Sequence, residues 1–234
     1  GKIFDRFVNR ITFPFYSLSG LVIGFTGRSL EKDTQCKYLN SPETPLFHKG
    51  KTLFGIYQAR QEISKSDKCY LVEGQFDVLS FVQSGYPNTV CGSGTALTLD
   101  QVRIIKKFTR NVTAVYDGDA AGMKASVRNM DIMLAEGMNV RAVLLPEGED
   151  PDSFARKMGT EKLAKFLKKQ ETDFISFIYK AFESEMDDPI RKTEVLRIIA
   201  QSISVVPDKL QRQAYIVSLA ERFNADGELI TNLV

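Results

Sequence analysis

The sequence predicts an α/β fold in which a central, mostly parallel sheet of four strands follows a small mixed α/β region and precedes a bundle of helices. Short apolar runs at 69–72, 112–116 and 140–145 alternate with segments of helical periodicity, the pattern of parallel strands joined by crossover helices. Each of these runs leads into carboxylates. Beyond about residue 160 the pattern is helical throughout.

The region 1–66 is predicted to form a small, basic α/β unit. Apolar segments at 11–15 and 21–25 flank a Ser19-Gly20 turn, which indicates a β-hairpin, and 53–63 has helical periodicity. In the first 70 residues, Lys and Arg outnumber Asp and Glu eleven to six, although the whole chain carries a formal charge of only +2. A basic first third beside an acidic sheet edge suits an enzyme that handles a polyanion.

The region 67–160 is predicted to hold the sheet. A short fourth strand at 89–91 completes it, and helices are expected at 76–83, 98–108 and 120–136. Thr98 and Gln101 have the spacing of a capping box, and Pro151 suits the first turn of a further helix. Each helix lies between two strands, as crossover connections require.

The region 161–234 is predicted to be a helical bundle, because apolar residues recur there at three- and four-residue spacing. Breaks are expected near Gln170, Pro189 and Pro207, and no further strand is expected. No apolar stretch approaches the roughly 20 residues of a membrane span, and three cysteines outside any CxxC spacing fit a reducing cytoplasm.

Acidic pairs follow three of the predicted strands. Because the carboxyl ends of parallel strands meet at one edge, these pairs are expected to lie close together, where their repulsion would require a cation such as Mg²⁺. The pairs are Glu73 with Asp77, Asp117 with Asp119, and Asp150 with Asp152. Structural roles stay open for two members: Asp150 could cap the helix that begins at Pro151, and Asp77 could sit in a helix's first turn for electrostatic reasons. Glu147 and Glu149 fit solvated loop charges.

Six motifs together resemble the Toprim proteins and, within them, the DnaG-type bacterial primases. Glu73-Gly74-Gln75-Phe76-Asp77 with Asp117-Gly118-Asp119 resembles the Toprim signature. The further matches are KYLNSPET at 37–44, FHKG at 47–50, YDGDAAG at 116–122 and GEDPD at 148–152. The order and spacing of the motifs match as well.

The resemblance implies a Toprim domain acting as a DNA-directed RNA polymerase, a nucleotidyltransferase that makes short RNA primers on single-stranded DNA during replication. It implies catalysis through two or more Mg²⁺ or Mn²⁺ ions. Carried over residue by residue, it implies catalytic roles for Glu73, Asp117 and Asp119, metal binding by these three with Asp77, Asp150 and Asp152, and nucleic-acid or nucleotide binding by Arg28, Lys37, Asn40 and Lys49.

The resemblance also implies partners. These are the single-stranded template, NTPs and nascent RNA, with the replicative helicase of the primosome contacting a region expected to be absent from this chain. The family's zinc module is also expected to be absent, and the cytoplasm is the expected location. Two other classes remain open: a topoisomerase- or nuclease-type Toprim enzyme, and a non-catalytic Toprim scaffold that binds nucleic acid.

Overall fold

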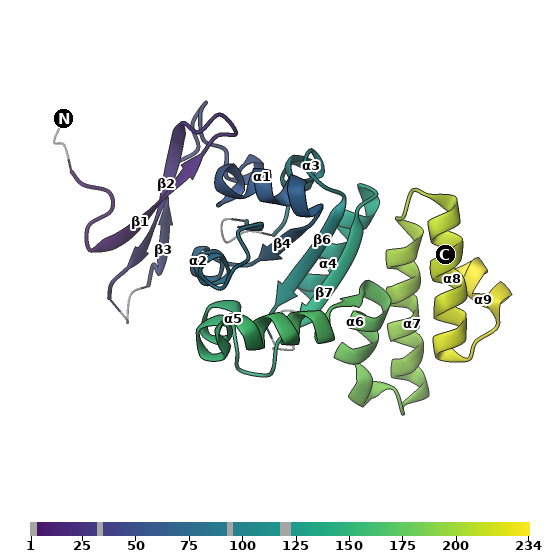
Figure 1. Ribbon diagram of the computed structural model, residues 1–234. Coiled ribbons are helices and arrows are strands. Elements are labelled where there is room, and N and C mark those ends of the chain that lie inside the picture. Colours follow the sequence, from purple (N-terminus) through teal and green to yellow (C-terminus); the bar gives the residue numbers. More distant parts are fainter. Residues whose placement is uncertain (1–3, 32–34, 93–95, 118–122) are drawn as a thin grey trace.

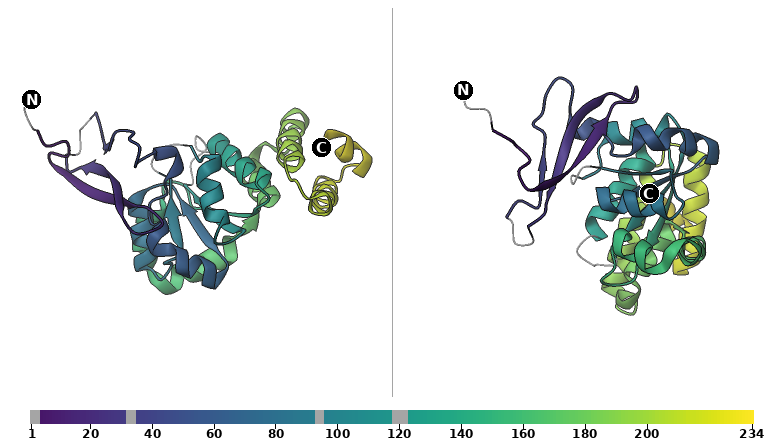
Figure 2. Two further views of the ribbon diagram at one scale, coloured as in Figure 1. Left: turned by 90° about the horizontal axis from the view of Figure 1, so that it is seen from above. Right: turned by 60° about the vertical axis from the view of Figure 1, so that its left-hand side comes forward.

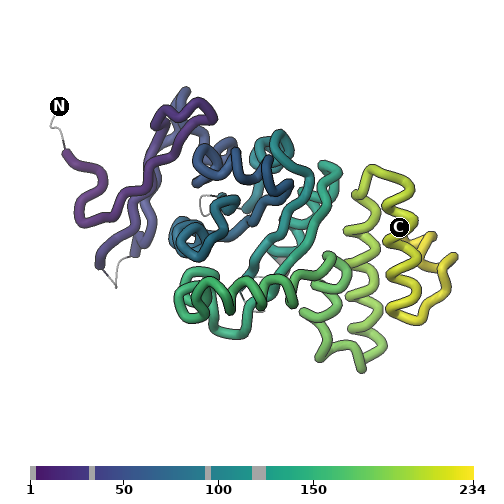
Figure 3. The backbone as a smooth tube through the Cα atoms, in the orientation of Figure 1, coloured from purple at the N-terminus to yellow at the C-terminus, as the bar shows by residue number. Residues whose placement is uncertain are grey.

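The computed structural model describes residues 4–31, 35–92, 96–117 and 123–234. Three parts follow one another across the molecule: a small antiparallel sheet, a central α/β part and a group of helices (Figure 1). The small sheet and the last helices lie on opposite sides of the central part in the left view of Figure 2 and in Figure 3. The order of the parts in space therefore follows their order in the sequence.

The first sheet contains β1 (Arg10–Tyr16), β2 (Val22–Ser29) and β3 (Tyr38–Asn40), in that order and antiparallel. Strands β1 and β2 form the predicted hairpin, and Gly20 adopts a φ of 90° in the turn, which favours glycine. Strand β3 was not predicted, because it has only three residues and, unlike 89–91, does not lie between two segments of helical periodicity. It pairs with β2 and places Tyr38 opposite Arg28.

The central sheet contains four parallel strands in the order β5-β4-β6-β7, which confirms the predicted parallel sheet. They are β4 (Cys69–Val72), β5 (Thr89–Cys91), β6 (Asn111–Tyr116) and β7 (Asn139–Leu144). A fifth strand, β8 (Thr172–Asp173), pairs antiparallel with β7. The prediction of no strand beyond residue 160 was therefore wrong, because a two-residue strand leaves no period in the sequence.

Five helices surround this sheet. They are α1 (Ile56–Ser66), α2 (Gln75–Gln83), α3 (Leu99–Lys106), α4 (Met123–Ala135) and α5 (Pro151–Gln170). Helices α2 and α5 cover one face, packing on Val72 and its neighbours, whereas α1, α3 and α4 cover the other, packing on Leu71 and its neighbours. Successive strand residues point to opposite faces, so both faces are buried, as in other parallel sheets. The predicted start of the third crossover helix, 120–122, lies outside the described residues.

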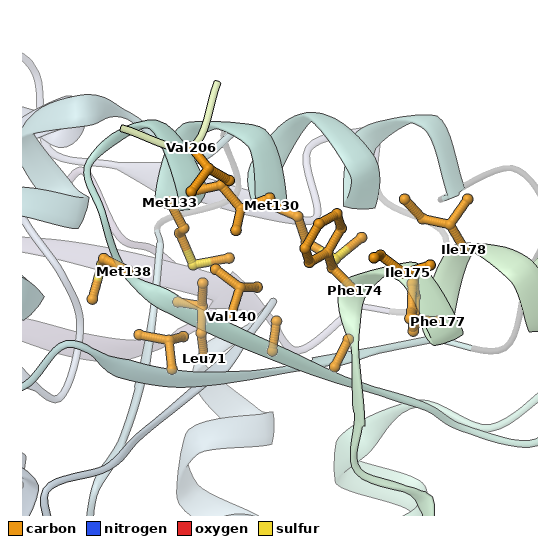
Figure 4. Packing of buried hydrophobic residues seen from close by; sticks show 14 of the residues in the cluster. Leu71, Met130, Met133, Met138, Val140, Phe174, Ile175, Phe177, Ile178 and Val206 are labelled. Carbon is orange, nitrogen blue, oxygen red and sulfur yellow. The ribbon is translucent and has the colours of Figure 1, made fainter. Parts of the chain in front are cut away.

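The last part contains α6 (Phe174–Ala181), α7 (Pro189–Ser204), α8 (Lys209–Phe223) and α9 (Gly227–Leu233). The short 3₁₀ turn η2 (Glu183–Glu185) lies between α6 and α7, and a second 3₁₀ turn, η1 (Lys49–Lys51), precedes α1. Asp188 and Asp208 cap α7 and α8, which explains the predicted breaks. Phe174 and Phe177 belong to the same buried cluster as Met130 of α4 and Val140 of β7 (Figure 4). The helical part thus shares its core with the sheet.

The expected boundary at residue 160 lies inside α5, beside a kink at Gly159, where φ is 68°. The division into 1–66, 67–160 and 161–234 stays a prediction. Among the described residues, no helix is both long and apolar enough to cross a membrane.

Candidate active site

Two of the predicted acidic residues directly follow neighbouring parallel strands. Glu73 follows β4 and Asp117 follows β6, and these strands pair in parallel along Cys69–Leu71. Burial raises the pKa of the Tyr116 hydroxyl, and the negative charge of Glu73 adds to this, which places Glu73 close to the end of β6. Glu73 is exposed and Asp117 is half-buried. The structure thus brings both carboxylates to the carboxyl edge of the sheet.

Asp77 lies buried in the first turn of α2 and joins two parts of this edge. One carboxylate oxygen, Oδ2, accepts a hydrogen bond from the Gly74 N–H at 2.7 Å, and Oδ1 accepts one from the Asp152 N–H at 3.2 Å. Burial raises the pKa of Asp77 to about 7, the Gly74 hydrogen bond opposes this, and the charges of Asp117 and Asp150 raise it further. Asp117 and Asp150 therefore both lie close enough to Asp77 for their charges to act on it.

Asp150 and Asp152 have different surroundings at the start of α5. Asp150 is exposed and caps α5 by accepting a hydrogen bond from the Ser153 N–H at 2.6 Å. The capping role left open for it is therefore present, and its charge also raises the pKa of Asp77. Asp152 is half-buried and accepts a hydrogen bond from the Ser80 hydroxyl at 2.5 Å and one from the Arg156 guanidinium at 2.8 Å.

Glu149 is bound within its own helix region rather than facing the acidic edge. It accepts hydrogen bonds from Lys157 and Ser153, and these bonds hold its pKa below the usual value. Glu147 is exposed. The interpretation as a solvated charge fits Glu147, whereas the Glu149 side chain is only 16% exposed and is paired, so that interpretation was wrong for Glu149.

Arg28 reaches the acidic edge from the antiparallel sheet. Its guanidinium lies 4.3 Å from the centroid of the Phe76 ring in α2 and 5.7 Å from that of Tyr38, and it donates a hydrogen bond to the Tyr38 hydroxyl at 3.3 Å. Burial raises the pKa of Tyr38, Arg28 opposes this, and the charge of Asp77 adds to the rise. Arg28 and Tyr38 therefore lie beside the carboxylates.

The other three predicted nucleic-acid contacts lie on the segment between β2 and α1. Lys37 is exposed before β3, Asn40 ends β3, and Lys49 in η1 accepts a hydrogen bond through its carbonyl from Gln101 of α3. Since α3 follows the carboxyl end of β5, Lys49 also lies toward the acidic edge. Within the described part of the chain, the side chains of these three residues make no hydrogen bond or ion pair, which leaves them accessible to a ligand.

Four residues near the edge were not predicted as site residues: Tyr38, Phe76, Ser80 and Arg156. Two of them, Tyr38 and Phe76, stand inside the quoted motifs, and an aromatic residue between two acidic ones is the signal that could have identified Phe76. The other two each lie about one helical turn from a motif residue, Ser80 after Asp77 and Arg156 after Asp152, and carry no signal of their own.

The residues present suit a divalent cation. Carboxylate oxygens are the donors that Mg²⁺ and Mn²⁺ prefer. Burial raises the pKa of Asp77 most, and a bound cation would offset both that burial and the added repulsion from Asp117 and Asp150. The described residues contain no group of three or more metal-binding side chains already gathered in a coordinating geometry, and Asp119 lies outside them. A cavity of about 340 Å³ borders Glu73 and Tyr116 and gives a ligand room at this edge.

Three family models match successive parts of the chain. The DNA primase catalytic core, N-terminal domain, matches residues 1–60, a Toprim-like domain matches 70–155, and the DnaB-helicase binding domain of primase matches 183–228. The last match lies within this chain. It goes against the expectation that the region contacting the helicase is absent.

Named relatives agree with these matches. The chain is 38% identical over 226 residues to the DNA primase of Halalkalibacterium halodurans, covering 96% of this chain and 38% of that protein. It is similar to the crystal structure of a DNA primase domain from Pseudomonas aeruginosa, with a TM-score of 0.85, 34% identity, and coverage of 98% of this chain and 73% of that one. It is also similar to a DnaG primase catalytic domain bound to single-stranded DNA, with a TM-score of 0.79, 35% identity, and coverage of 93% and 71%.

Proposed function

The chain belongs to the DnaG-type DNA primase family, as part of the catalytic core, and from that premise we propose that it synthesises short RNA primers on single-stranded DNA. The observation that carries the proposal is the carboxylate edge of the central sheet. There, Asp77 is buried and has its pKa raised to about 7 by burial and then by the charges of Asp117 and Asp150. Such a cluster is costly without a cation, and nucleotidyl transfer uses cations.

Each carboxylate has a proposed role in this reaction. Asp117, Asp119, Asp150 and Asp152 would hold two or more Mg²⁺ or Mn²⁺ ions, with Asp77 supporting them. When bound, these ions neutralise triphosphate charge and lower the pKa of the attacking 3′-hydroxyl. Glu73, exposed at the end of β4, would complete the catalytic set with Asp117 and Asp119.

The basic residues would hold the phosphates of template, primer and nucleotide. Arg28 is fixed by Phe76 and Tyr38 beside the carboxylates, so we propose that it contacts the phosphate nearest the metals. Lys37, Asn40 and Lys49 would contact the strands farther along. Contacts of this kind set position rather than read sequence.

The proposed partners follow from these roles. They are a single-stranded DNA template, NTPs and nascent RNA, and in the cytoplasm the replicative helicase. The family match to 183–228 supports a helicase contact through η2, α7 and α8 of this chain. A relative captured with single-stranded DNA supports the template.

A nuclease- or topoisomerase-type reaction would use the same carboxylates. One assay separates these reactions from primer synthesis: incubate the protein with labelled single-stranded DNA, Mg²⁺ and the four NTPs. New RNA that depends on all four NTPs is the expected result. Loss or relinking of the DNA strand without RNA would overturn the proposal, and DNA binding without either reaction would favour the non-catalytic scaffold.

A further inference from the structure

The carboxylate of Asp152 is held by a donor on each of its two oxygens. The Ser80 hydroxyl, from α2, donates to Oδ1 at 2.5 Å, and the Arg156 guanidinium, one turn farther along α5, donates to Oδ2 at 2.8 Å. Ser80 is only 5% exposed, and the Asp152 side chain is 15% exposed. The carboxylate therefore has a defined orientation between two helices.

A second contact beside it ties the same helices together. The Asp152 N–H donates to Oδ1 of Asp77, whose Oδ2 accepts from the Gly74 N–H. Gly74 directly follows Glu73, and Asp152 lies two residues after Asp150. These hydrogen bonds of Asp77 and Ser80 thus fix the start of α5 relative to the end of β4.

We propose that Ser80 and Arg156 are positioning residues, which hold the Asp152 carboxylate for a cation bound at the carboxylate edge. This inference rests on the proposed function. Each carboxylate oxygen has two acceptor sites, and the two donors occupy one on each oxygen, so each oxygen keeps a site for a cation. Partners of this kind orient a ligating carboxylate, and their loss typically lowers metal affinity about 10- to 100-fold.

A purely structural role would give a different result. If the Ser80–Asp152 bond only joined α2 to α5, its removal would lower stability and leave the metal affinity of the folded protein unchanged. Arg156 separates the two roles further, because its side chain is 67% exposed and an exposed ion pair contributes little to stability. The readout must therefore be metal affinity, measured beside stability.

The test measures Mn²⁺ binding by calorimetry and urea unfolding on the full 234-residue chain. The variants are Ser80→Ala and Arg156→Gln. The matched controls are Ser84→Ala, at the buried serine that directly follows α2, and Lys165→Gln, at an exposed lysine on α5. We expect each variant to bind Mn²⁺ about 10-fold more weakly than its control, and Arg156→Lys, which keeps one donor, to recover part of the loss.

A double-mutant cycle shows whether the two residues act through Asp152. In an Asp152→Asn background, Ser80→Ala and Arg156→Gln should lower Mn²⁺ affinity no further. Variants that match their controls, or losses that add fully to that of Asp152→Asn, would overturn the inference while leaving primer synthesis by the wild type intact. A wild type that binds no Mn²⁺ would remove the proposed function as well, so the two failures are distinguishable.

Discussion

The two ends of the central sheet both carry acidic residues, and they treat them in opposite ways. At the amino-terminal end, Asp67 accepts hydrogen bonds from Thr109 at 2.7 Å and Asn111 at 2.9 Å, and Glu171 accepts from Lys68 at 2.6 Å and from Thr113. Burial would raise the pKa of Glu171, but these hydrogen bonds outweigh it and lower the pKa.

At the carboxyl end the balance is reversed. Asp77 also accepts two hydrogen bonds, yet its burial and the neighbouring charges of Asp117 and Asp150 raise its pKa to about 7. An acidic residue at a strand end is therefore no sign of function by itself. The charge of its neighbours separates an acid that stabilises the fold from one that needs a ligand.

The largest expected effect comes from removing one charge at the carboxyl end. Asp117→Asn should abolish primer synthesis and Mn²⁺ binding while the metal-free protein stays at least as stable, because one of the repelling charges is gone. Calorimetry with Mn²⁺ and urea unfolding measure the two effects. The matched control is Asp67→Asn at the other end, which should lower stability and keep the metal. Full Mn²⁺ affinity in Asp117→Asn would remove Asp117 from the site.

Removing a positive charge instead of a negative one tests the amino-terminal end of the sheet. Lys68→Met leaves the Glu171 carboxylate without its cation and should cost about 2 kcal/mol of unfolding free energy. Mn²⁺ affinity should not change. Adding Glu171→Gln should restore part of the stability, since the stranded charge is removed. A Lys68→Met protein as stable as wild type would show that the pair contributes nothing.

Stability and Mn²⁺ affinity should both depend on pH through the carboxyl end of the sheet. A carboxyl whose pKa is higher folded than unfolded adds stability at low pH, and this is lost as pH rises through about 7, the value given for Asp77. The protonated form binds a cation poorly, so Mn²⁺ affinity should rise with pH below 7, by up to about tenfold per unit, and level off above it. Calorimetry across pH 5.5–8 in paired buffers is the check; affinity independent of pH, with no proton released, would contradict it.

The smallest expected effect concerns the basic residue beside the acids. Arg28→Ala should weaken binding of single-stranded DNA a few-fold and reduce the slope of log K against log salt by about 0.7. Phe76→Leu, which removes the ring under the guanidinium, should cost about 0.5–1 kcal/mol of the same binding. Fluorescence anisotropy over a salt series measures both, with Lys65→Ala on α1 as control. Identical slopes for the wild type and the three variants would show that Arg28 does not contact the DNA.

The sequence was sufficient to predict the elements that leave a local pattern of apolar or capping residues. Apolar runs identified the four parallel strands, and local hydrogen bonding identified helix starts: the Thr98 side chain accepts from the Gln101 N–H, and Asp150 caps α5 before Pro151. These signals lie within a few residues of one another, so no tertiary structure is needed to read them.

Contacts between distant segments could not be predicted in the same way. The Ser80–Asp152 hydrogen bond joins residues 72 positions apart, and the Arg28–Phe76 contact joins strand β2 of the first sheet to helix α2. Periodicity indicates which face of a helix is buried, but not which side chain it meets there. Asp119, predicted from its motif, lies outside the described residues, so its placement stays a prediction.

The order of the strands in the sheet has a consequence for folding kinetics. The β1–β2 hairpin closes over a few residues and can form early, whereas β4, β6 and β7 pair across long crossovers, and such non-local pairing is slow. The charges of Asp117 and Asp150 act on Asp77 from different crossover units, so the three carboxylates come within range only after β4, β6 and β7 have paired. In a stopped-flow refolding experiment, Mn²⁺ binding should therefore appear in the last kinetic phase, after most of the helical signal has returned.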